Sequence, residues 1–334
     1  MKKFLSVIMA SALALSLVAC GSDSTDANDA TASTESSADG QTYNVGVIQL
    51  VQHVALDAAT EGFQDALTEK LGDQVTITVE NAAGDTPTCS TIANQFASEN
   101  VDLIMANATP ALQAAQAATD SIPIVATSIT DYGTALSIDD WTGSTGINVT
   151  GTADLAPLDG QAEMLNELFP DAKNVGIIYC SAEANSVYQA TTITGYLEEY
   201  GYNVTEFTFS DSNDVASVTQ SACDASDVIY VPTDNTAASC AETINNVAIT
   251  AGIPIVAGEE GICKGCGIAT LSISYYDIGY AAGLMAYDIL VNGADPATTE
   301  IQYATEFTKE YNPDIAEKLG IEIPSDYVAI DMSE

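Results

Sequence analysis

Hydroxyl, amide and carboxylate side chains follow short apolar runs in the first half of the chain. Gln49 and His53 come after one such run, and Asn107 and Thr109 come after another. Thr109 precedes a proline, which is typical of a helix start. Its hydroxyl either caps that helix or, with the free N–H groups behind it, receives a ligand carboxylate. A third run is followed by Ser128, Thr130 and Asp131 in the hydroxyl-rich segment 127–131.

The second half repeats this arrangement. Glu183, Asn185 and Ser186 follow an apolar run and open a helix, and Asp234 and Asn235 do the same further along the chain. Asp234 either caps its helix or pairs with a ligand ammonium group inside a closed cleft, where a charge-assisted bond gains strength. The spacing leaves these two alternatives open.

Two later positions complete the set of candidates. Glu259 follows another strand end and is a second candidate for an ammonium group. Tyr275 and Tyr276 begin a helix and either stack on a ligand ring or pack in the ordinary way. The candidate ligand-binding residues are Gln49, His53, Asn107, Thr109, Ser128, Thr130, Asp131, Glu183, Asn185, Ser186, Asp234, Asn235, Glu259 and Tyr275.

These residues do not form a catalytic or metal-binding pattern. His53 is the only histidine; no Ser/His/Asp relay surrounds it, and a zinc site needs about four ligands. Cys263 and Cys266 form a CxxC, but we expect it in a Gly-rich loop before a strand, not at the helix N-terminus that a redox pair prefers. We expect a loop-closing disulfide or two idle thiols there. The sequence therefore predicts no enzymatic activity, no metal and no cofactor.

The charge of the chain restricts its partners. There is no arginine, and beyond the first 19 residues five lysines face 47 acidic residues, a difference of 42 charges. Such a negative chain repels nucleic acid and anionic membrane surfaces. A bound carboxylate must then be held by backbone N–H groups, hydroxyls or helix N-termini.

Short apolar runs alternate with longer amphipathic stretches from residue 43 onward. The first series predicts strands at 43–48, 75–79, 103–106 and 123–126, separated by helices. After a Gly- and Thr-rich passage at 142–152, the alternation restarts. The second series predicts strands at 174–179, 204–209, 228–231, 254–257 and 269–273.

Two βα series of similar size predict an α/β protein with two doubly wound parallel-sheet lobes. Such sheets bind ligands beyond the carboxyl ends of their strands, so facing lobes place both sets of strand ends on one cleft. We expect residues 41–149 with about 275–297 in the first lobe, and 150–274 with about 298–334 in the second.

The N-terminus resembles the signal and lipobox of bacterial lipoproteins. Two lysines precede an apolar stretch that ends Leu17-Val18-Ala19-Cys20. We expect a signal peptide over residues 1–19, a diacylated (palmitate-bearing) Cys20, and a disordered linker over residues 20–40. An ordinary signal peptide with a chance cysteine is the alternative. The lipid would tether the body to the extracytoplasmic face of the cell membrane.

Several segments together resemble the ABC transporter substrate-binding proteins of the tryptophan/tyrosine type. The resemblance runs from 43 to about 325, with Gln52 and Val54 departing from the commoner pattern. It is carried by Gly46-Val47-Ile48-Gln49, His53-x-Ala55-Leu56-Asp57, Asn81-Ala82-x-Gly84-Asp85, Ala108-Thr109-Pro110, Ile122-Pro123-Ile124-Val125, Asn148-Val149-Thr150-Gly151, Glu183-x-Asn185-Ser186 and Tyr230-Val231-Pro232-Thr233-Asp234-Asn235.

The resemblance implies a type I periplasmic-binding-protein fold with three crossings between lobes. It also implies delivery of an amino acid, often aromatic, to an ABC permease and its ATPase. We expect the receptor to be a monomer. We expect the ligand carboxylate on Thr109 and Ser128, its ammonium on Asp234 and its side chain near Tyr275. The alternatives are a nucleoside, sugar or peptide-like signal in the same fold, a sensory role, and a thiol redox protein.

Overall fold

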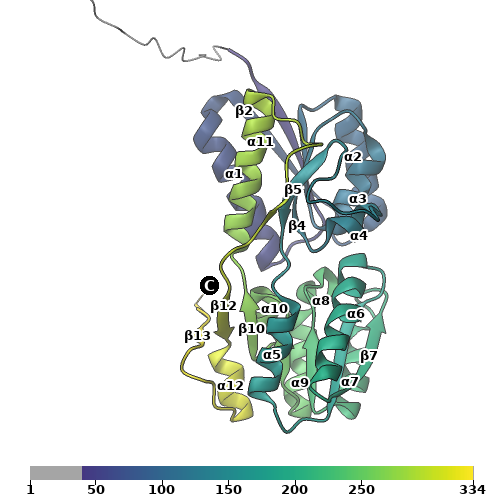
Figure 1. Cartoon of the computed structure of the whole chain (residues 1–334), viewed down its shortest axis with the longest axis vertical. Coiled ribbons are helices and arrows are strands. Elements are labelled where there is room, and N and C mark those ends of the chain that lie inside the picture. The colour runs from purple at the N-terminus through teal and green to yellow at the C-terminus, as the bar shows by residue number, and fades with distance from the viewer. Residues whose placement is uncertain (1–39, 334) are drawn as a thin grey trace, which may run out of the picture. The chain divides into compact units, whose positions relative to one another are not determined.

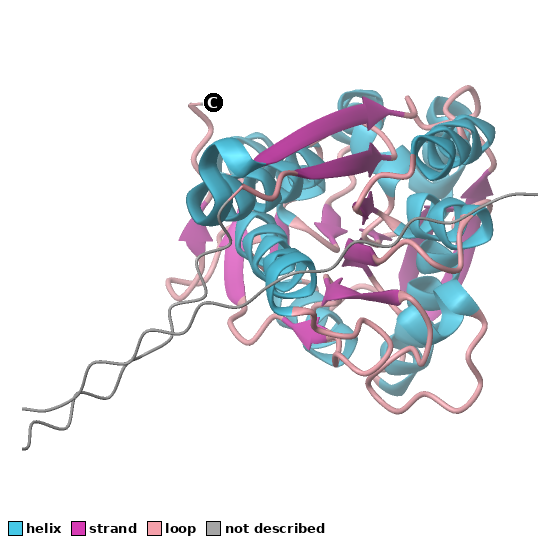
Figure 2. Cartoon of the chain, turned by 90° about the horizontal axis from the view of Figure 1, so that it is seen from above, coloured by secondary structure: helices cyan, strands magenta, loops and turns pink. Residues whose placement is uncertain are grey.

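The computed structural model describes residues 40–333, which form two β-sheets flanked by helices (Figures 1 and 2). The expected signal peptide, Cys20 and nearly all of the expected linker lie outside these residues. Within 40–333, no helix has the length and apolar character needed to cross a membrane.

The first sheet is parallel throughout and has the strand order β11-β5-β4-β3-β1-β2. Its central strands β3 and β4 are buried along their whole length, as expected for a parallel sheet covered on both faces. The strands are β1 Tyr43–Gln49, β2 Val75–Asn81, β3 Leu103–Asn107, β4 Ile124–Ile129, β5 Val149–Ala153 and β11 Gln302–Tyr303. The helices that accompany this sheet are α1 Val54–Leu71, α2 Thr86–Glu99, α3 Thr109–Ala118, α4 Tyr132–Leu136 and α11 Tyr275–Asn292, with a 3-10 turn at Gly72–Gln74.

The second sheet has the order β13-β12-β10-β9-β8-β6-β7, with β12 antiparallel to β10. Its strands are β6 Asn174–Cys180, β7 Asn203–Phe209, β8 Val228–Val231, β9 Ile255–Ala257, β10 Ala269–Ser272, β12 Thr308–Tyr311 and β13 Val328–Ala329. Its helices are α5 Leu158–Leu168, α6 Ala184–Glu199, α7 Val215–Ala225, α8 Asn235–Ser239, α9 Ala241–Ala251, α10 Glu260–Gly265 and α12 Pro313–Leu319.

The predicted fold class is confirmed. The chain passes between the sheets three times, from β5 to α5, from β10 to α11 and from β11 to β12. Strand pairing places residues 150–153 and 302–303 in the first sheet, beside β4 and β5 respectively. The limits of the two lobes otherwise stay a prediction.

The helical segment between β8 and β9 is divided into α8 and α9 at Cys240, whose backbone leaves the helical region. One local expectation was wrong. The CxxC expected in a loop lies in and just after the short helix α10, because the carboxylate of Glu259 accepts two backbone N–H groups and begins a helical turn there.

Helices α1 and α11 run side by side on one face of the first sheet (Figure 1). Small residues allow this close approach. A Cβ atom added at Gly279 would meet the backbone of Ala59, and one added at Gly283 would lie 2.6 Å from the Cβ of Ala66. The contact between these two helices fixes the start of α1 relative to the first turn of α11. His53, just before α1, is thereby held in position relative to Tyr275, the first residue of α11.

Candidate functional site

A buried amide network occupies the carboxyl ends of β1 and β3. The Thr60 hydroxyl donates to Gln49 Oε1 at 2.7 Å, and Asn107 Nδ2 donates to the Leu56 carbonyl at 2.8 Å and to Thr60 Oγ1 at 2.9 Å. Because the amide nitrogen of Asn107 faces that carbonyl, its Oδ1 points elsewhere. Asn107 Oδ1 is buried and has no hydrogen-bond partner among the described residues.

The backbone is strained where β3 and β4 end. Ala108 has φ +89° and Ser128 has φ +57°, and both are buried residues with a Cβ. Such conformations cost of order 1–3 kcal/mol and cluster at functional sites. The residue before α3 is Ala108, and no side chain caps this helix. Thr109, which is buried, therefore begins α3 without serving as its N-cap.

Asp154, which the sequence analysis missed, lies at the centre of a second buried network. Its Oδ1 accepts from the Thr130 hydroxyl and its Oδ2 from the Tyr275 hydroxyl, both at 3.1 Å. Burial raises the pKa of Asp154 to about 6 despite these two hydrogen bonds. Asp131, by contrast, caps α4 by accepting from Thr134 N at 2.7 Å.

In the second lobe, Glu183 organises the start of α8. Its Oε2 accepts from the backbone N–H of Asn235 at 3.1 Å and from the Asn235 side-chain amide at 2.7 Å. Its Oε1 accepts from the backbone N–H of Thr236 at 2.9 Å and from the Thr236 hydroxyl at 2.7 Å. Asn185 lies beside it and donates to the Thr233 carbonyl at 3.1 Å, while Ser186 is fully buried.

Asp234 and Glu259 both hold helix N-termini. Asp234 accepts from Ala237 N at 2.7 Å, as a cap of α8, and from Cys180 N at 2.6 Å. Burial, and secondarily the charge of Glu183, raises the pKa of Asp234 to about 7. Burial likewise raises the pKa of Glu259 to about 7, although it caps α10. The capping alternative for Asp234 is thus realised in the structure.

Two hydrogen bonds connect the strand ends of one lobe with those of the other. His53 Nε2 lies 3.3 Å from Asn235 Oδ1, and Gln189 Nε2 donates to Thr130 Oγ1 at 3.4 Å. Gln189 also escaped the sequence analysis. It lies four residues after Asn185 on α6, so a helical projection from that candidate would have found it.

Four of the predicted residues carry buried polar atoms that have no hydrogen-bond partner within residues 40–333. These atoms are His53 Nδ1, Asn107 Oδ1, Ser128 Oγ and Asn185 Oδ1. Buried polar atoms are normally paired, and leaving one unpaired costs about 1–3 kcal/mol. Their concentration at the strand ends makes this region the candidate site for a polar ligand.

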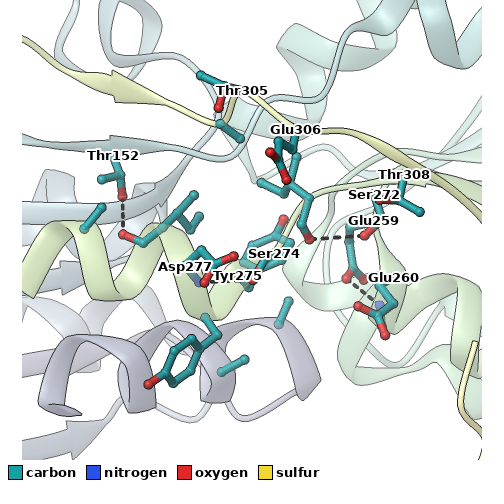
Figure 3. Close-up of a pocket in the computed structure, with 18 of the residues that line it drawn as sticks. Thr152, Glu259, Glu260, Ser272, Ser274, Tyr275, Asp277, Thr305, Glu306 and Thr308 are labelled. Carbon is teal, nitrogen blue, oxygen red and sulfur yellow. Dashed lines mark hydrogen bonds between the residues drawn. The ribbon is translucent and has the colours of Figure 1, made fainter. Parts of the chain in front are cut away.

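A cavity of about 490 Å³ lies beside these strand ends (Figure 3). It is bounded by the starts of α1, α10 and α11 and by the segments that cross between the lobes. Of the predicted residues, only Glu259 and Tyr275 line it. Tyr275 connects the cavity with the Asp154 network through its hydroxyl.

The cysteines are not arranged for redox chemistry. All six cysteines of the described chain are free, and Cys263 and Cys266 are buried. Burial raises the pKa of both thiols well above the usual range, which disfavours the reactive thiolate. Across residues 40–333, no cluster of three or more His, Cys, Asp or Glu side chains is arranged to hold a metal ion.

The chain belongs to the family of ABC transporter substrate binding proteins, whose family model matches residues 44–331. The tyrosine-binding protein of Clostridioides difficile (strain R20291) is 37% identical over 307 residues, covering 89% of this chain and 88% of that protein. The resemblance stated from the motifs is therefore confirmed.

Solved structures agree with this assignment. An L-Trp complex of an ABC domain from Streptococcus pneumonia superposes with a TM-score of 0.82 at 34% identity, covering 85% of this chain and 97% of that one. A ligand-free, open substrate binding protein with adhesive properties from Clostridium difficile superposes with a TM-score of 0.66 at 35% identity, covering 87% of this chain and 100% of that one. Structures of proteins that bind sugars, at 13–17% identity, show a similarity of fold alone.

Proposed function

We propose that this substrate-binding protein captures an aromatic amino acid between its two lobes and delivers it to an ABC permease and its ATPase. The main support for this proposal is the group of buried polar atoms at the strand ends that have no hydrogen-bond partner among the described residues. The tyrosine-binding and L-Trp-bound relatives support an aromatic amino acid as the ligand.

The ligand carboxylate is assigned to the start of α3 and to Ser128. Thr109 opens that helix, no side chain caps it, and Ser128 Oγ is buried without a partner. Helix N-termini and hydroxyls are the anion ligands that remain in a chain without arginine. The ligand ammonium is assigned to the negative region around Asp234, and the side chain to the region near Tyr275.

Closure of the lobes around the ligand is part of the proposal. The cross-lobe hydrogen bonds from His53 and Gln189 support it, as does the higher TM-score with the L-Trp complex than with the ligand-free, open structure. Of the other candidates, Gln49, Glu183 and Ser186 then support the cleft walls. The protein acts as a binding protein, without enzymatic activity and as a monomer.

The proposed location is the extracytoplasmic face of the cell membrane. Signal cleavage before Cys20, diacylation of this cysteine and a linker to residue 40 would tether the receptor near its permease. We expect Cys20→Ser to abolish incorporation of labelled palmitate and to release the protein from the membrane fraction. Unchanged labelling of the Cys20→Ser protein would contradict the anchor.

Isothermal titration with a panel of amino acids, sugars and nucleosides tests the ligand class. We expect saturable binding of L-tryptophan, L-tyrosine or L-phenylalanine, and a ligand at 100 times its Kd should stabilise the fold by about 2.7 kcal/mol. Binding of a sugar or nucleoside, with no heat and no thermal shift from any aromatic amino acid, would overturn the assignment.

A further inference from the structure

The hydrogen bond between the lobes determines which nitrogen of His53 carries the proton. Asn235 Nδ2 donates to Glu183 Oε2 at 2.7 Å, and since a carboxylate oxygen accepts, this bond fixes the orientation of the Asn235 amide. Asn235 Oδ1 then faces His53 Nε2 at 3.3 Å. Because an amide oxygen only accepts, Nε2 must carry a hydrogen.

The other ring nitrogen of His53 is consequently an acceptor. Burial is the largest influence on the pKa of His53 and lowers it, against the smaller opposing effects of Asn235, Glu183 and Asp57. A neutral imidazole has one N–H, which here is on Nε2, so Nδ1 presents a lone pair. Within residues 40–333, Nδ1 is buried and has no hydrogen-bond partner.

Two further strand-end residues, one in each lobe, carry unpartnered acceptors. Asn107 donates its amide hydrogens to the Leu56 carbonyl, in the first turn after His53, and to Thr60 Oγ1. Asn185 donates to the Thr233 carbonyl at 3.1 Å and approaches the same Glu183 oxygen that orients Asn235. Their Oδ1 atoms, like His53 Nδ1, are acceptors that need a donor.

The ionisable groups around this network are acidic. Asp154, Glu183, Asp234 and Glu259 are all buried carboxyl groups at strand ends. In the described part of the chain, the ion pairs involve only Lys70 and Lys309, neither of which reaches these acids. Acceptors among buried carboxyl groups that form no ion pair with a lysine suit a ligand group that is positive and rich in N–H donors, as an ammonium group is.

We propose that His53 binds the ammonium group of the ligand through Nδ1, and that Asn235 from the opposite lobe selects this acceptor tautomer as the lobes close. The proposal rests on the proposed function and deepens it. Asn107 and Asn185 supply neighbouring acceptors, while Asp234, whose two oxygens each accept a backbone N–H, acts through its charge. Recognition of the ammonium group is thereby completed only in the closed arrangement.

The tautomer is directly measurable because His53 is the only histidine in the chain. In ¹⁵N-labelled protein without a polyhistidine tag, long-range ¹H–¹⁵N spectra contain one imidazole. With saturating L-tryptophan at pH 7 we expect a neutral ring with the proton on Nε2, and a hydrogen-bond shift of the Nδ1 signal. A proton on Nδ1, or an imidazolium ring, in the bound protein would overturn the proposal.

Substitution separates the ammonium contact from binding in general. His53→Gln keeps an N–H donor near the Nε2 position and removes the Nδ1 acceptor. We expect affinity for L-tryptophan to fall about 10- to 100-fold. Affinity for the analogue lacking the amino group, indole-3-propionate, should change less than threefold, which also shows that the variant site is intact.

The outcomes distinguish this proposal from the proposed function. If wild-type protein binds neither tryptophan, tyrosine nor phenylalanine, the proposed function itself fails. If wild-type protein binds the amino acid and His53→Gln weakens the amino acid and the analogue equally, or weakens neither, the function stands and the role of His53 Nδ1 is refuted.

Discussion

Tyr275 and Tyr276 are adjacent in the chain, yet their hydroxyl groups donate to carboxylates in opposite environments. Tyr275 donates to buried Asp154 at 3.1 Å, whereas Tyr276 donates to exposed Asp65 at 2.9 Å. We expect Tyr275→Phe to lower the free energy of unfolding by about 1.5–3 kcal/mol at pH 7.5, because it leaves a buried carboxylate with one donor fewer. Tyr276→Phe should cost much less, because water screens an exposed pair and can replace the lost donor.

Urea unfolding of both variants provides the measurement. The cost of Tyr275→Phe should also shrink at pH 5, since the pKa of Asp154 is about 6 and its protonated form depends less on the tyrosine donor. Equal losses for the two variants would show that burial of the Asp154 network contributes nothing to stability.

Single residues also show how far the sequence could predict the site. The strand-end rule identified the residues with unpartnered atoms, such as Asn107 and Ser128. It missed Asp154 because no strand was predicted in the Gly- and Thr-rich passage before it, whereas Val149–Ala153 is a strand that ends beside β4. Asp131 and Glu259 show the converse limit, because spacing does not distinguish a helix cap from a ligand contact.

At the level of elements, the pairing of α1 with α11 requires residues without side chains. A Cβ at Gly279 would be forced against the carbonyl of Ala59 in α1. We expect Gly279→Ala to destabilise the protein by about 1–3 kcal/mol, because overpacking at the helix interface outweighs the gain in helix propensity. Thermal unfolding measures the difference.

Gly195 provides the matched control for Gly279. It also lies inside a helix, α6, but a Cβ added there would meet no atom within 4 Å. Gly195→Ala should therefore raise stability by up to about 1 kcal/mol through helix propensity. If both substitutions stabilise the protein, the α1–α11 contact is looser than the structure indicates.

Strands that are long and buried could be predicted from the sequence, whereas short and exposed strands could not. The strands β3 and β4 are entirely buried, and their continuous apolar runs identified them. The strands β11 and β13 have two residues each and are exposed, so no apolar pattern marks them. Only pairing with distant segments makes them strands.

For the whole molecule, the buried carboxyl groups predict how stability depends on pH. The pKa values of Asp154, Asp234 and Glu259 are raised to about 6, about 7 and about 7. Between about pH 4 and pH 7 the folded protein thus holds protons that the unfolded chain has lost. Raising the pH through this window should destabilise the unliganded protein, by up to about 1.4 kcal/mol per pH unit for each group.

Urea unfolding from pH 5 to pH 8 checks this prediction. The Asp154→Asn variant distinguishes the effect of a buried carboxyl group from general charge repulsion in a chain of net charge −40. The variant keeps the surface charges and should show a shallower decline between pH 5 and pH 7. An unliganded wild-type protein that gains stability over this range would contradict the raised pKa values.

The edge strand of the first sheet has a consequence for how the chain folds. Thr152 in β5 pairs with Gln302 in β11, 150 positions further along the chain. Helix α11 packs on α1, although more than 200 residues separate their first residues. Loop-closure entropy delays contacts between such distant segments, so the first sheet cannot be completed until almost the entire chain has been synthesised. A nascent chain that lacks its last 40 residues has none of β11, β12 and β13, so it can complete neither sheet.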